Sequence, residues 1–208
     1  MGQRDATKLF SEWADNGRDE GMERGHTPSV TVMLERLLEG VTSPFTAIDI
    51  GCGNGWVVRK LANHSLCTHA SGVDGAPSMI QKAKDIDPQG DYVEAMLPAW
   101  APREPFDLVH SMEFLYYLHD PFAFLVEVHQ RWMSPGGKIV IGVDHYAENP
   151  SSLDWGESLQ VHMTTLSIEG WMQGLTKAGF VDVKAEQVGA KEGWSGTLVL
   201  TAVKPELT

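Results

Sequence analysis

Short apolar runs alternate with segments of helical periodicity along most of the chain, and each run has the length of a strand. The glycine-rich, charged stretch at residues 16–26 has neither pattern and is predicted to be a loop. We predict strands at residues 46–50, 69–74, 91–95, 106–111, 137–144, 180–188 and 196–204. We predict helices at residues 5–15, 28–40, 55–64, 76–87, 120–133 and 167–180.

This alternation predicts the fold class. Strands that alternate with helices form βαβ units, which place helices on both faces of a largely parallel sheet. The last two predicted strands have no helix between them, so we expect them to pair antiparallel at one edge. The pattern therefore predicts a doubly wound α/β fold. Residues 1–208 are expected to form one domain, with an N-terminal helical extension at 1–40 and a core at 45–208.

Three glycines follow the first predicted strand, in the stretch "DIGCGNG" that contains Gly51, Gly53 and Gly55. Glycine there lets the backbone approach a ligand, and ligands of open α/β sheets bind outside the carboxyl ends of the strands. Asp74 ends the second predicted strand, 23 positions after Gly51, where a carboxylate can accept hydrogen bonds from both ribose hydroxyls. The combination favours an adenosine-type cofactor over a tight turn without a ligand. Dinucleotide folds use a different spacing, G-x-G-x-x-G.

Composition narrows the expected partners and location. The net charge of the 208 residues is −12 with no cluster of Lys and Arg, so we expect no binding to nucleic acid. No apolar run approaches the roughly 20 residues of a membrane span, and the polar N-terminus lacks a secretory signal. Cys52 and Cys67 are too few for a disulfide framework, so we expect reduced thiols in a cytoplasmic protein.

From about residue 45 onward, the chain resembles the class I S-adenosylmethionine-dependent methyltransferases, specifically the small-molecule group known as methyltransferase type 11. The glycine turn resembles the first motif of that family, "GVDGAPSMIQKAK" the second, and "FDLVHSMEFLYYLHDP" the motif of the fourth strand. The resemblance implies a Rossmann-like sheet of seven strands, mostly parallel with an antiparallel last strand. It also implies S-adenosylmethionine as the cofactor and S-adenosylhomocysteine as the product. The expected cofactor-binding residues are Asp49, Gly51, Cys52, Gly53, Gly55, Asp74, Gly75, Met79, Glu94, Ala95, Met96, Ser111 and Met112.

One part of the pattern departs from the family. Many relatives carry an Asp before a Leu-Pro near the third strand, where it contacts the adenine amine. This chain reads "VEAMLP" there, so the resemblance assigns that role to Glu94, with the backbone of Ala95 and Met96 beside it. Met79 is expected near the adenine, and Ser111 with Met112 near the methionine end of the cofactor.

The expected reaction is transfer of a methyl group to a small-molecule acceptor by in-line displacement, for which the protein mainly positions the reactants. A general base helps where the nucleophile carries a proton, and the candidates are His119, His145 and Tyr146. A metal site is not expected. The histidines lack paired ligand spacing, and Asp144-His145 stands where catechol-type methyltransferases have an Asp-Asn pair.

The N-terminal helix is a candidate lid. It carries Phe10 and Trp13 with apolar spacing, and the open side of the cofactor pocket is the nearest surface that needs a cover. A lid would direct Trp13, and with it Arg24 or His26, into the pocket; the alternative is an ordinary packing helix. The aromatic residues that could surround a cation or flat substrate are Trp13, Trp56, Phe114, Tyr116 and Tyr117.

Two other functions stay open at this point. A protein that binds S-adenosylmethionine or S-adenosylhomocysteine as a sensor, without transfer, would share the cofactor motifs. A nucleotide-dependent oxidoreductase is disfavoured by the glycine spacing. Neither the acceptor nor the oligomeric state follows from the sequence.

Overall fold

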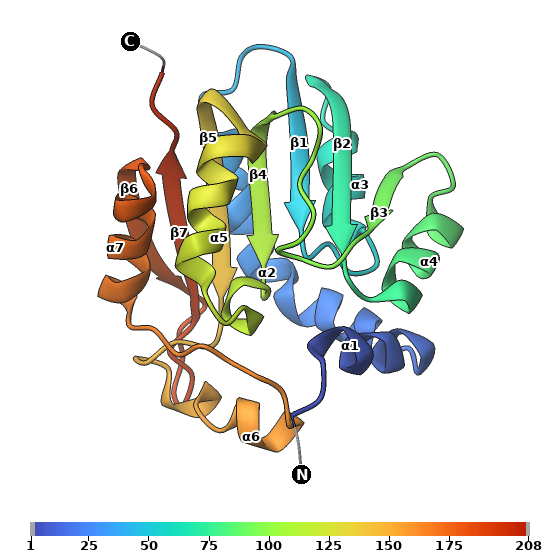
Figure 1. Cartoon of the computed structure of the whole chain (residues 1–208), viewed down its shortest axis with the longest axis vertical. Helices are drawn as coiled ribbons and strands as arrows, with labels where there is room; N and C mark the ends of the chain where they lie inside the picture. Colours follow the sequence, from blue (N-terminus) through green and yellow to red (C-terminus); the bar gives the residue numbers. More distant parts are fainter. Residues whose placement is uncertain (1–2, 207–208) are drawn as a thin grey trace.

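The structure of the chain, a computed structural model that describes residues 3–206, is built on one seven-stranded sheet in the order β3-β2-β1-β4-β5-β7-β6 (Figure 1). The strands are β1 Phe45–Ile50, β2 Cys67–Asp74, β3 Asp91–Glu94, β4 Phe106–Met112, β5 Met133–Val143, β6 Val181–Val188 and β7 Thr197–Val203. The helices are α1 Ala6–Asp15, α2 Asp19–Leu38, α3 Trp56–Ala62, α4 Pro77–Ile86, α5 Pro121–Glu127, α6 Trp155–Leu159 and α7 Ile168–Ala178. Every predicted strand is present within a few residues of its expected bounds.

The pairing pattern confirms the predicted mostly parallel sheet with an antiparallel last strand. β1 pairs in parallel with both β2 and β4, and β3 and β5 extend the parallel sheet on either side. β7 runs antiparallel between β5 and β6. From β1 the chain continues to β2 and β3 on one side and then crosses to β4 on the other side of β1. The strand order thus reverses at β1, and the carboxyl end of β1 is the switch point where such sheets bind ligands.

Both faces of the sheet are covered, as Figure 1 shows. On one face, apolar residues of α2 and α3 such as Met33 and Val57 pack on Ala47 of β1. On the other face, α5 and α7 pack over Ile48, with the indole of Trp171 fully buried. This arrangement explains why the central strands are apolar at consecutive positions, since neighbouring residues point to opposite faces and both faces are buried.

The N-terminal region differs from the prediction at one point. The predicted loop at 16–26 is wrong for most of its length, because α2 begins at Asp19 and only residues 16–18 separate it from α1. Asp19 and Glu20 stand in the first turn of α2, where acidic side chains favour a helix N-terminus. Pro28 consequently lies inside the helix rather than at its start. Tertiary packing of α2 outweighs the proline and the glycines of this stretch.

Within residues 3–206, no helix has both the length and the apolar character that crossing a bilayer requires. The longest, α2, carries charged residues through its first half, including Asp19, Glu20 and Glu23. Its apolar residues, including Val30, Met33 and Leu37, pack on the sheet.

Candidate active site

The three glycines of the turn after β1 have positive φ angles, of 75° at Gly51, 52° at Gly53 and 76° at Gly55. A Cβ on Gly51 would lie 2.7 Å from the Cβ of Phe114, and a Cβ on Gly55 would lie 2.3 Å from Cε1 of Tyr92. Neither position has room for a side chain. Two of the three glycines therefore let the turn pack against the protein itself.

Gly53 faces open space instead. A Cβ built there would meet a single side chain, the sulfur of Met79 at 3.8 Å. The Gly53 N–H donates to Oδ2 of Asp74 over 2.9 Å, and the Ala76 N–H donates to Oδ1 over 2.8 Å. These bonds fix the Asp74 carboxylate beside the glycine. Burial raises the pKa of this carboxyl group, although the two backbone donors oppose the shift.

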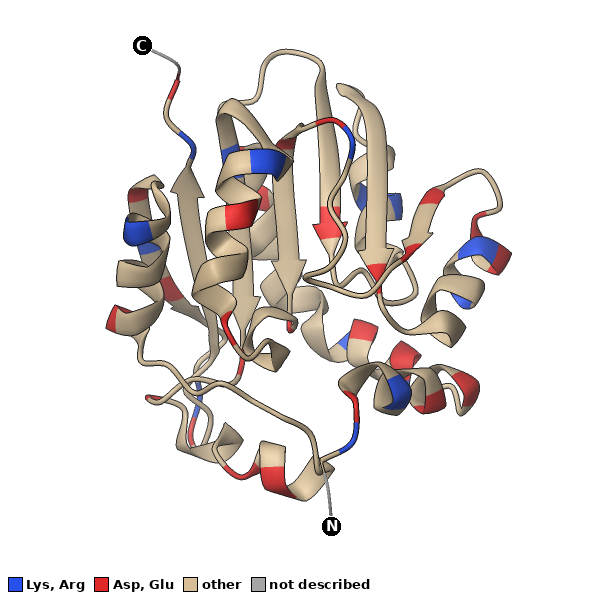
Figure 2. Ribbon diagram, viewed as in Figure 1, with Lys and Arg blue, Asp and Glu red and all other residues tan. Residues whose placement is uncertain are grey.

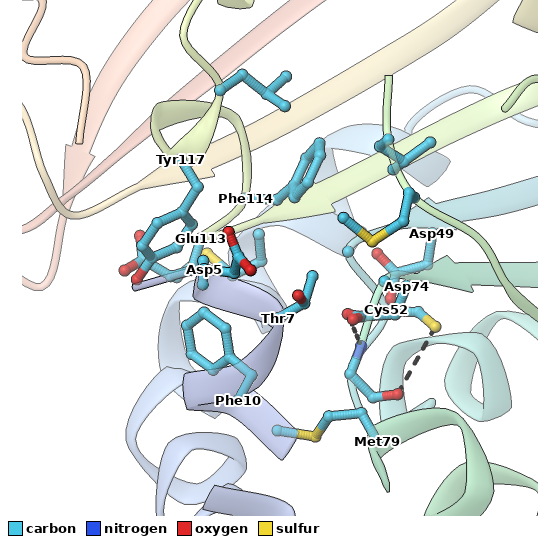
Figure 3. Close-up of a pocket in the computed structure, with 18 of the residues that line it drawn as sticks. Asp5, Thr7, Phe10, Asp49, Cys52, Asp74, Met79, Glu113, Phe114 and Tyr117 are labelled. Carbon is cyan, nitrogen blue, oxygen red and sulfur yellow. Dashed lines mark hydrogen bonds between the residues drawn. The ribbon is translucent and has the colours of Figure 1, made fainter. Parts of the chain in front are cut away.

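A cavity of about 960 Å³ lies against this turn, at the carboxyl ends of β1, β2 and β4 (Figure 3). Small-molecule sites usually span about 300–1,000 Å³, so the cavity is large enough for a nucleoside cofactor and an acceptor together. Segments far apart in sequence line it: residues 3–7 with Phe10, the start of α2, the glycine turn, residues 96–98 and the segment after β4. The predicted site residues among its lining are His26, Asp49, Gly51, Cys52, Gly53, Asp74, Gly75, Met79, Met96, Met112 and His119.

This geometry fits the cofactor that the resemblance implies. The space beside Gly53 would be filled by a side chain at that position, so the backbone is kept bare where the cofactor must approach. The Asp74 carboxylate borders the same cavity, and each of its oxygens has a second lone pair for a ribose hydroxyl. Met79 adds an apolar surface against which a flat base can lie.

Four predicted cofactor residues lie outside the cavity lining. Gly55 is buried behind Tyr92, and Ser111 donates from its hydroxyl to the Ile50 carbonyl over 3.0 Å, which joins β4 to β1. The Glu94 side chain is exposed at the end of β3. Ala95 continues the chain from there, and its N–H donates to the Asp74 carbonyl. The prediction for Glu94 is not supported, because Met96 and the two residues after it form the wall instead.

The proposed roles of His145 and Tyr146 as general bases are wrong for this geometry. Both are buried, and neither lines the cavity. The two ring nitrogens of His145 are occupied by the Ser152 carbonyl at 2.9 Å and the Thr165 hydroxyl at 2.8 Å. The Tyr146 hydroxyl donates to backbone carbonyls of the turn before β7, and burial raises its pKa. Both side chains therefore fasten loops to the sheet.

His119 does reach the cavity. It is exposed at the mouth, and its ring lies 3.8 Å, centroid to centroid, from the ring of His162, which also lines the cavity. Nε2 of His162 pairs with the Thr164 hydroxyl at 2.9 Å. Burial, followed by the proximity of His119, lowers the pKa of His162. Of the three predicted bases, His119 is the one that lines the cavity, so it stays the candidate base.

The N-terminal segment covers one side of the cavity, and whether it moves as a lid stays a prediction. Residues 3–7 and Phe10 line it, and the Phe10 ring meets Tyr117 edge-on at 5.3 Å (Figure 3). Trp13 does not face the cavity; its ring packs edge-on against Phe10 at 5.3 Å. Arg24 is exposed and also outside the lining, so the expected orientation is wrong for both residues.

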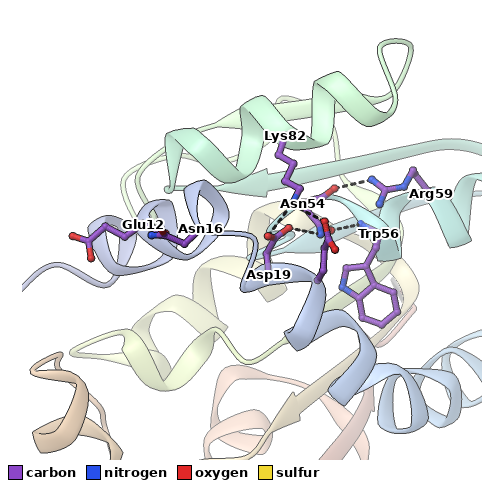
Figure 4. Close-up of polar contacts among 8 residues, drawn as sticks. Glu12, Asn16, Asp19, Asn54, Trp56, Arg59 and Lys82 are labelled. Carbon is purple, nitrogen blue, oxygen red and sulfur yellow. Dashed lines mark hydrogen bonds and ion pairs between the residues drawn. The ribbon is translucent and has the colours of Figure 1, made fainter.

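The start of α2 is tied to the glycine turn by a residue that the sequence analysis assigned to a loop. The Asp19 carboxylate, almost fully buried, accepts from the Asn54 amide over 2.9 Å and from Nζ of Lys82 over 2.8 Å (Figure 4). Asn54 lies in the glycine turn and Lys82 on α4. A buried carboxylate needs such partners, so this contact fixes the relative positions of three segments around the cavity.

Glu113, directly after β4, is a site residue that the sequence analysis missed. Its φ angle is +56°, a conformation that residues other than glycine adopt at an energetic cost and often at functional sites. Its carboxylate lines the cavity and accepts from the Tyr116 hydroxyl and the Asp144 N–H, each over 2.5 Å. Burial, with the charge of Asp144, raises the pKa of Glu113 well above its usual range. Tyr116 thus supports the lining from behind and is not itself part of it.

The cavity has a strongly acidic lining. Arg4 is the single arginine among the described residues that border it, and its guanidinium pairs with Glu12. Figure 2 shows acidic residues at the carboxyl ends of β1 and β2 and on the N-terminal helices below them. The bordering carboxylates are Asp5, Asp19, Glu23, Asp49, Asp74, Glu113, Asp120 and Glu127.

Comparison with known proteins agrees with this geometry. A sequence profile of the methyltransferase-domain family matches residues 7–185. A trans-aconitate 2-methyltransferase of Azoarcus sp. (strain BH72) is 32% identical over 106 residues, which are 51% of this chain and 42% of that protein. A ubiquinone biosynthesis O-methyltransferase of Maricaulis maris is 34% identical over 112 residues, 51% of this chain and 41% of that protein. The match thus spans less than half the length of either relative.

Solved structures give the same fold. A methyltransferase of Haloferax volcanii, described as putative and solved in complex with the Trm112 methyltransferase activator, superposes with a TM-score of 0.83 at 28% identity. That alignment covers 98% of this chain and 99% of the other. The N-methyltransferase NodS of Bradyrhizobium japonicum, solved with S-adenosylhomocysteine, has a TM-score of 0.68 at 22% identity over 85% of each chain. The chain therefore belongs to the methyltransferase-domain family and has the fold of the S-adenosylmethionine-dependent methyltransferases.

Proposed function

We propose that the chain transfers the methyl group of S-adenosylmethionine to a small-molecule acceptor that is neutral or cationic where it meets the cavity. The observation that carries the proposal is the lining itself: a bare glycine and a ribose-binding carboxylate at one end, and acidic and aromatic residues at the other. The cofactor supplies an activated methyl group. What the chain adds is position, shielding from water and a place for the released proton.

The acidic lining of the cavity argues against trans-aconitate, the acceptor named for several relatives, as the acceptor of this chain. Trans-aconitate carries three carboxylates, and a site for it needs cationic groups to compensate them. The single lining arginine is already paired with Glu12, whereas carboxylates border the cavity on several sides. A tricarboxylate would be repelled. An amine or an uncharged hydroxyl compound would not, and the rings of Phe10, Phe114 and Tyr117 offer it an aromatic wall.

The roles we propose follow the geometry of the cavity. Asp74 would hold the ribose, and the bare backbone at Gly53 would admit the cofactor. Met112, at the end of β4, borders the cavity between these residues and Glu113, where the methyl group would face the acceptor. His119 would take a proton on a ring nitrogen from an acceptor that carries one, at the mouth where the proton can pass to water.

A methyl-transfer assay tests this proposal. The chain is incubated with radiolabelled S-adenosylmethionine and matched sets of acceptors: primary and secondary amines, phenols, and polycarboxylates including trans-aconitate. Label should enter amines or phenols and leave the polycarboxylates unlabelled. Efficient labelling of trans-aconitate would contradict the acceptor class, while the cofactor assignment would stand.

Calorimetry separates the two other functions. Preferential binding of NADH over S-adenosylmethionine would favour an oxidoreductase and sink the proposal. Binding of S-adenosylmethionine with no transfer to any acceptor class would favour a sensor. The cavity volume of about 960 Å³ supports the transferase, because a cofactor alone would leave much of that space unfilled.

The methyl-transfer assay should also test whether the chain needs a second polypeptide. The Haloferax volcanii relative was solved with an activator protein, and this chain matches it along nearly its whole length. A chain that binds the cofactor but shows no transfer should therefore be assayed again in extract from its own source. Transfer that appears only with extract would point to a protein activator rather than to a sensor.

A further inference from the structure

Three side chains with metal-binding atoms meet at the acceptor end of the cavity. His26 comes from α2, Glu113 from the segment after β4, and Asp144 from the segment after β5. One ligand atom from each lies within 4.8 Å of those of the other two. The three positions are far apart in sequence and share no motif, so only the fold brings them together.

The distance between two of these groups is informative. Nε2 of His26 lies 3.6 Å from Oδ2 of Asp144, which is too long for a hydrogen bond. Two ligands of one ion, each bound at about 2.0–2.1 Å and separated by a tetrahedral angle, stand roughly 3.4 Å apart. The observed spacing is therefore close to that of two atoms with an ion between them.

A second, independent observation is an unpartnered oxygen. Asp144 is 5% exposed, and its Oδ1 has no hydrogen-bond partner among the described residues. A buried carboxylate oxygen without a donor is costly, since it loses its hydration and gains nothing in return. A cation bound beside it would remove that cost.

Hydrogen bonds also fix the orientation of the Glu113 carboxylate. The Tyr116 hydroxyl and the Asp144 N–H each donate to one of its oxygens, and each oxygen keeps a further lone pair. Such supporting donors orient the carboxylate ligands of metal sites. The positive φ angle of Glu113 turns this side chain toward the cluster at the cost of backbone strain.

We propose that His26, Glu113 and Asp144 form a binding site for one divalent cation of borderline softness, such as Zn²⁺ or Co²⁺. One imidazole with two carboxylates is a donor set for these ions rather than for Ca²⁺, which takes oxygen ligands. Three protein ligands leave at least one coordination position open. The sequence analysis expected no metal site because the ligands have no characteristic spacing.

The open position faces the cavity, since both His26 and Glu113 line it. A bound cation there could hold an oxygen or an uncharged nitrogen of a neutral acceptor, a role that rests on the proposed methyl transfer. The binding of the ion does not rest on it. A chain that binds the cation but transfers no methyl group would retain the metal site and lose only that role.

The test is a titration of the purified full chain, first stripped with EDTA, with ZnCl₂ by calorimetry and with Co²⁺ by visible absorption. We expect one saturable site per chain. His26→Ala, Glu113→Gln and Asp144→Asn should each weaken binding by at least about tenfold, the lower end of the loss seen when even an outer-shell partner of a metal site is removed.

His69→Ala is the matched control. Nε2 of His69 lies 3.2 Å from Oδ2 of Asp91, but both side chains are about half exposed and no third ligand from residues 3–206 joins them. This variant should bind the ion as the unaltered chain does. Thermal unfolding checks that each variant folds, and His26→Ala decides if Asp144→Asn does not fold, because the side chain of His26 is 24% exposed and that of Asp144 only 7%. Absence of saturable binding, or equal affinity in His26→Ala, would overturn the site.

Discussion

Asp49 and His110 face each other across neighbouring strands, with Oδ1 of the carboxylate 2.7 Å from Nδ1 of the imidazole. Both are almost fully buried, and Nε2 of His110 has no partner among the residues that the structure describes. Asp49 also borders the cavity, so this contact supports the floor of the cofactor site from within the sheet. Removing one partner would leave the other polar group buried and alone.

His110→Phe should therefore lower the free energy of unfolding by about 3 kcal/mol, the usual cost of leaving a buried charge without its partner. His110→Asn places an amide nitrogen near the position of Nδ1 and should recover a substantial part of that loss. Urea unfolding of both variants measures the difference. Equal stability of the two would mean that shape, not the hydrogen bond to Asp49, is what the position requires.

The glycine turn offers a closely matched pair of substitutions. Gly53 and Gly17 both have positive φ angles, of 52° and 69°, and a Cβ at either would touch little or no protein. Gly53→Ala and Gly17→Ala should each lose about 1–2 kcal/mol of stability through backbone strain. Only Gly53→Ala should also lose affinity for S-adenosylmethionine in calorimetry. A Gly53→Ala chain that binds the cofactor normally would show that the turn has a structural role alone.

Asp74→Ala should weaken cofactor binding by about 1–3 kcal/mol, because charge-assisted hydrogen bonds to the ribose are lost. Asp91→Ala, an exposed carboxylate on the neighbouring β3, is the control and should leave the affinity unchanged. Calorimetry with S-adenosylhomocysteine measures both. Unchanged affinity in Asp74→Ala would remove this residue from the site.

The lid prediction can be tested at a shorter segment of the chain than the sequence indicated. Because α2 starts at Asp19, a protease can reach the connection only at residues 16–18, where trypsin cleaves after Arg18. We expect cleavage in the free chain and protection by S-adenosylhomocysteine. Exposed Lys191, in the turn between β6 and β7, gives an internal control that the ligand should not affect. Cleavage after Arg18 at the same rate with and without ligand would identify α1 as a fixed packing helix.

His129 should make stability depend on pH. Burial, followed by the charge of Lys204, lowers the pKa of this imidazole, which packs edge-on against Phe180 at 4.9 Å. The unfolded chain takes up a proton near pH 6.5 while the folded chain resists it, so stability is lost as the pH falls below that value. His129→Gln should therefore lose less stability than the unaltered chain between about pH 7.5 and 5.5. An identical pH profile would show that His129 titrates equally in both states.

The fold could be predicted from the sequence because the central strands have a clear hydrophobic pattern. Their apolar runs are bounded by glycines, and the crossover helices between them begin at residues such as Asp120, whose carboxylate accepts from the Ala123 N–H as a helix cap should. The cofactor end was accessible for the same reason. Its chemistry lies in a local motif, at fixed distances from the end of a strand.

The acceptor end of the cavity could not be predicted in this way. Glu113 and Asp144 follow two different strands and His26 lies within α2, so their meeting depends on how α2 lies across the sheet. The start of α2 was misread because its stabilising partners, Asn54 and Lys82, are distant in sequence. Conversely, His145 and Tyr146 looked reactive by residue type, yet hydrogen bonds to residues as distant as Thr165 and Gly196 hold them in the interior. Tertiary contacts, which a single sequence does not reveal, decide these placements.

The first half of α2 also sets the distance between the cofactor end and the acceptor end of the cavity. Asp19 and His26 are seven residues apart, close to two turns, so they lie on nearly the same side of the helix and roughly 10 Å apart along its axis. Asp19 is bonded to the glycine turn, and His26 lies at the acceptor end. The helix is thus a rigid spacer between the two halves of the cavity. One residue inserted between Asp19 and His26 would rotate one relative to the other by about 100°, so the register of this segment limits how the distance between cofactor and acceptor can change in evolution.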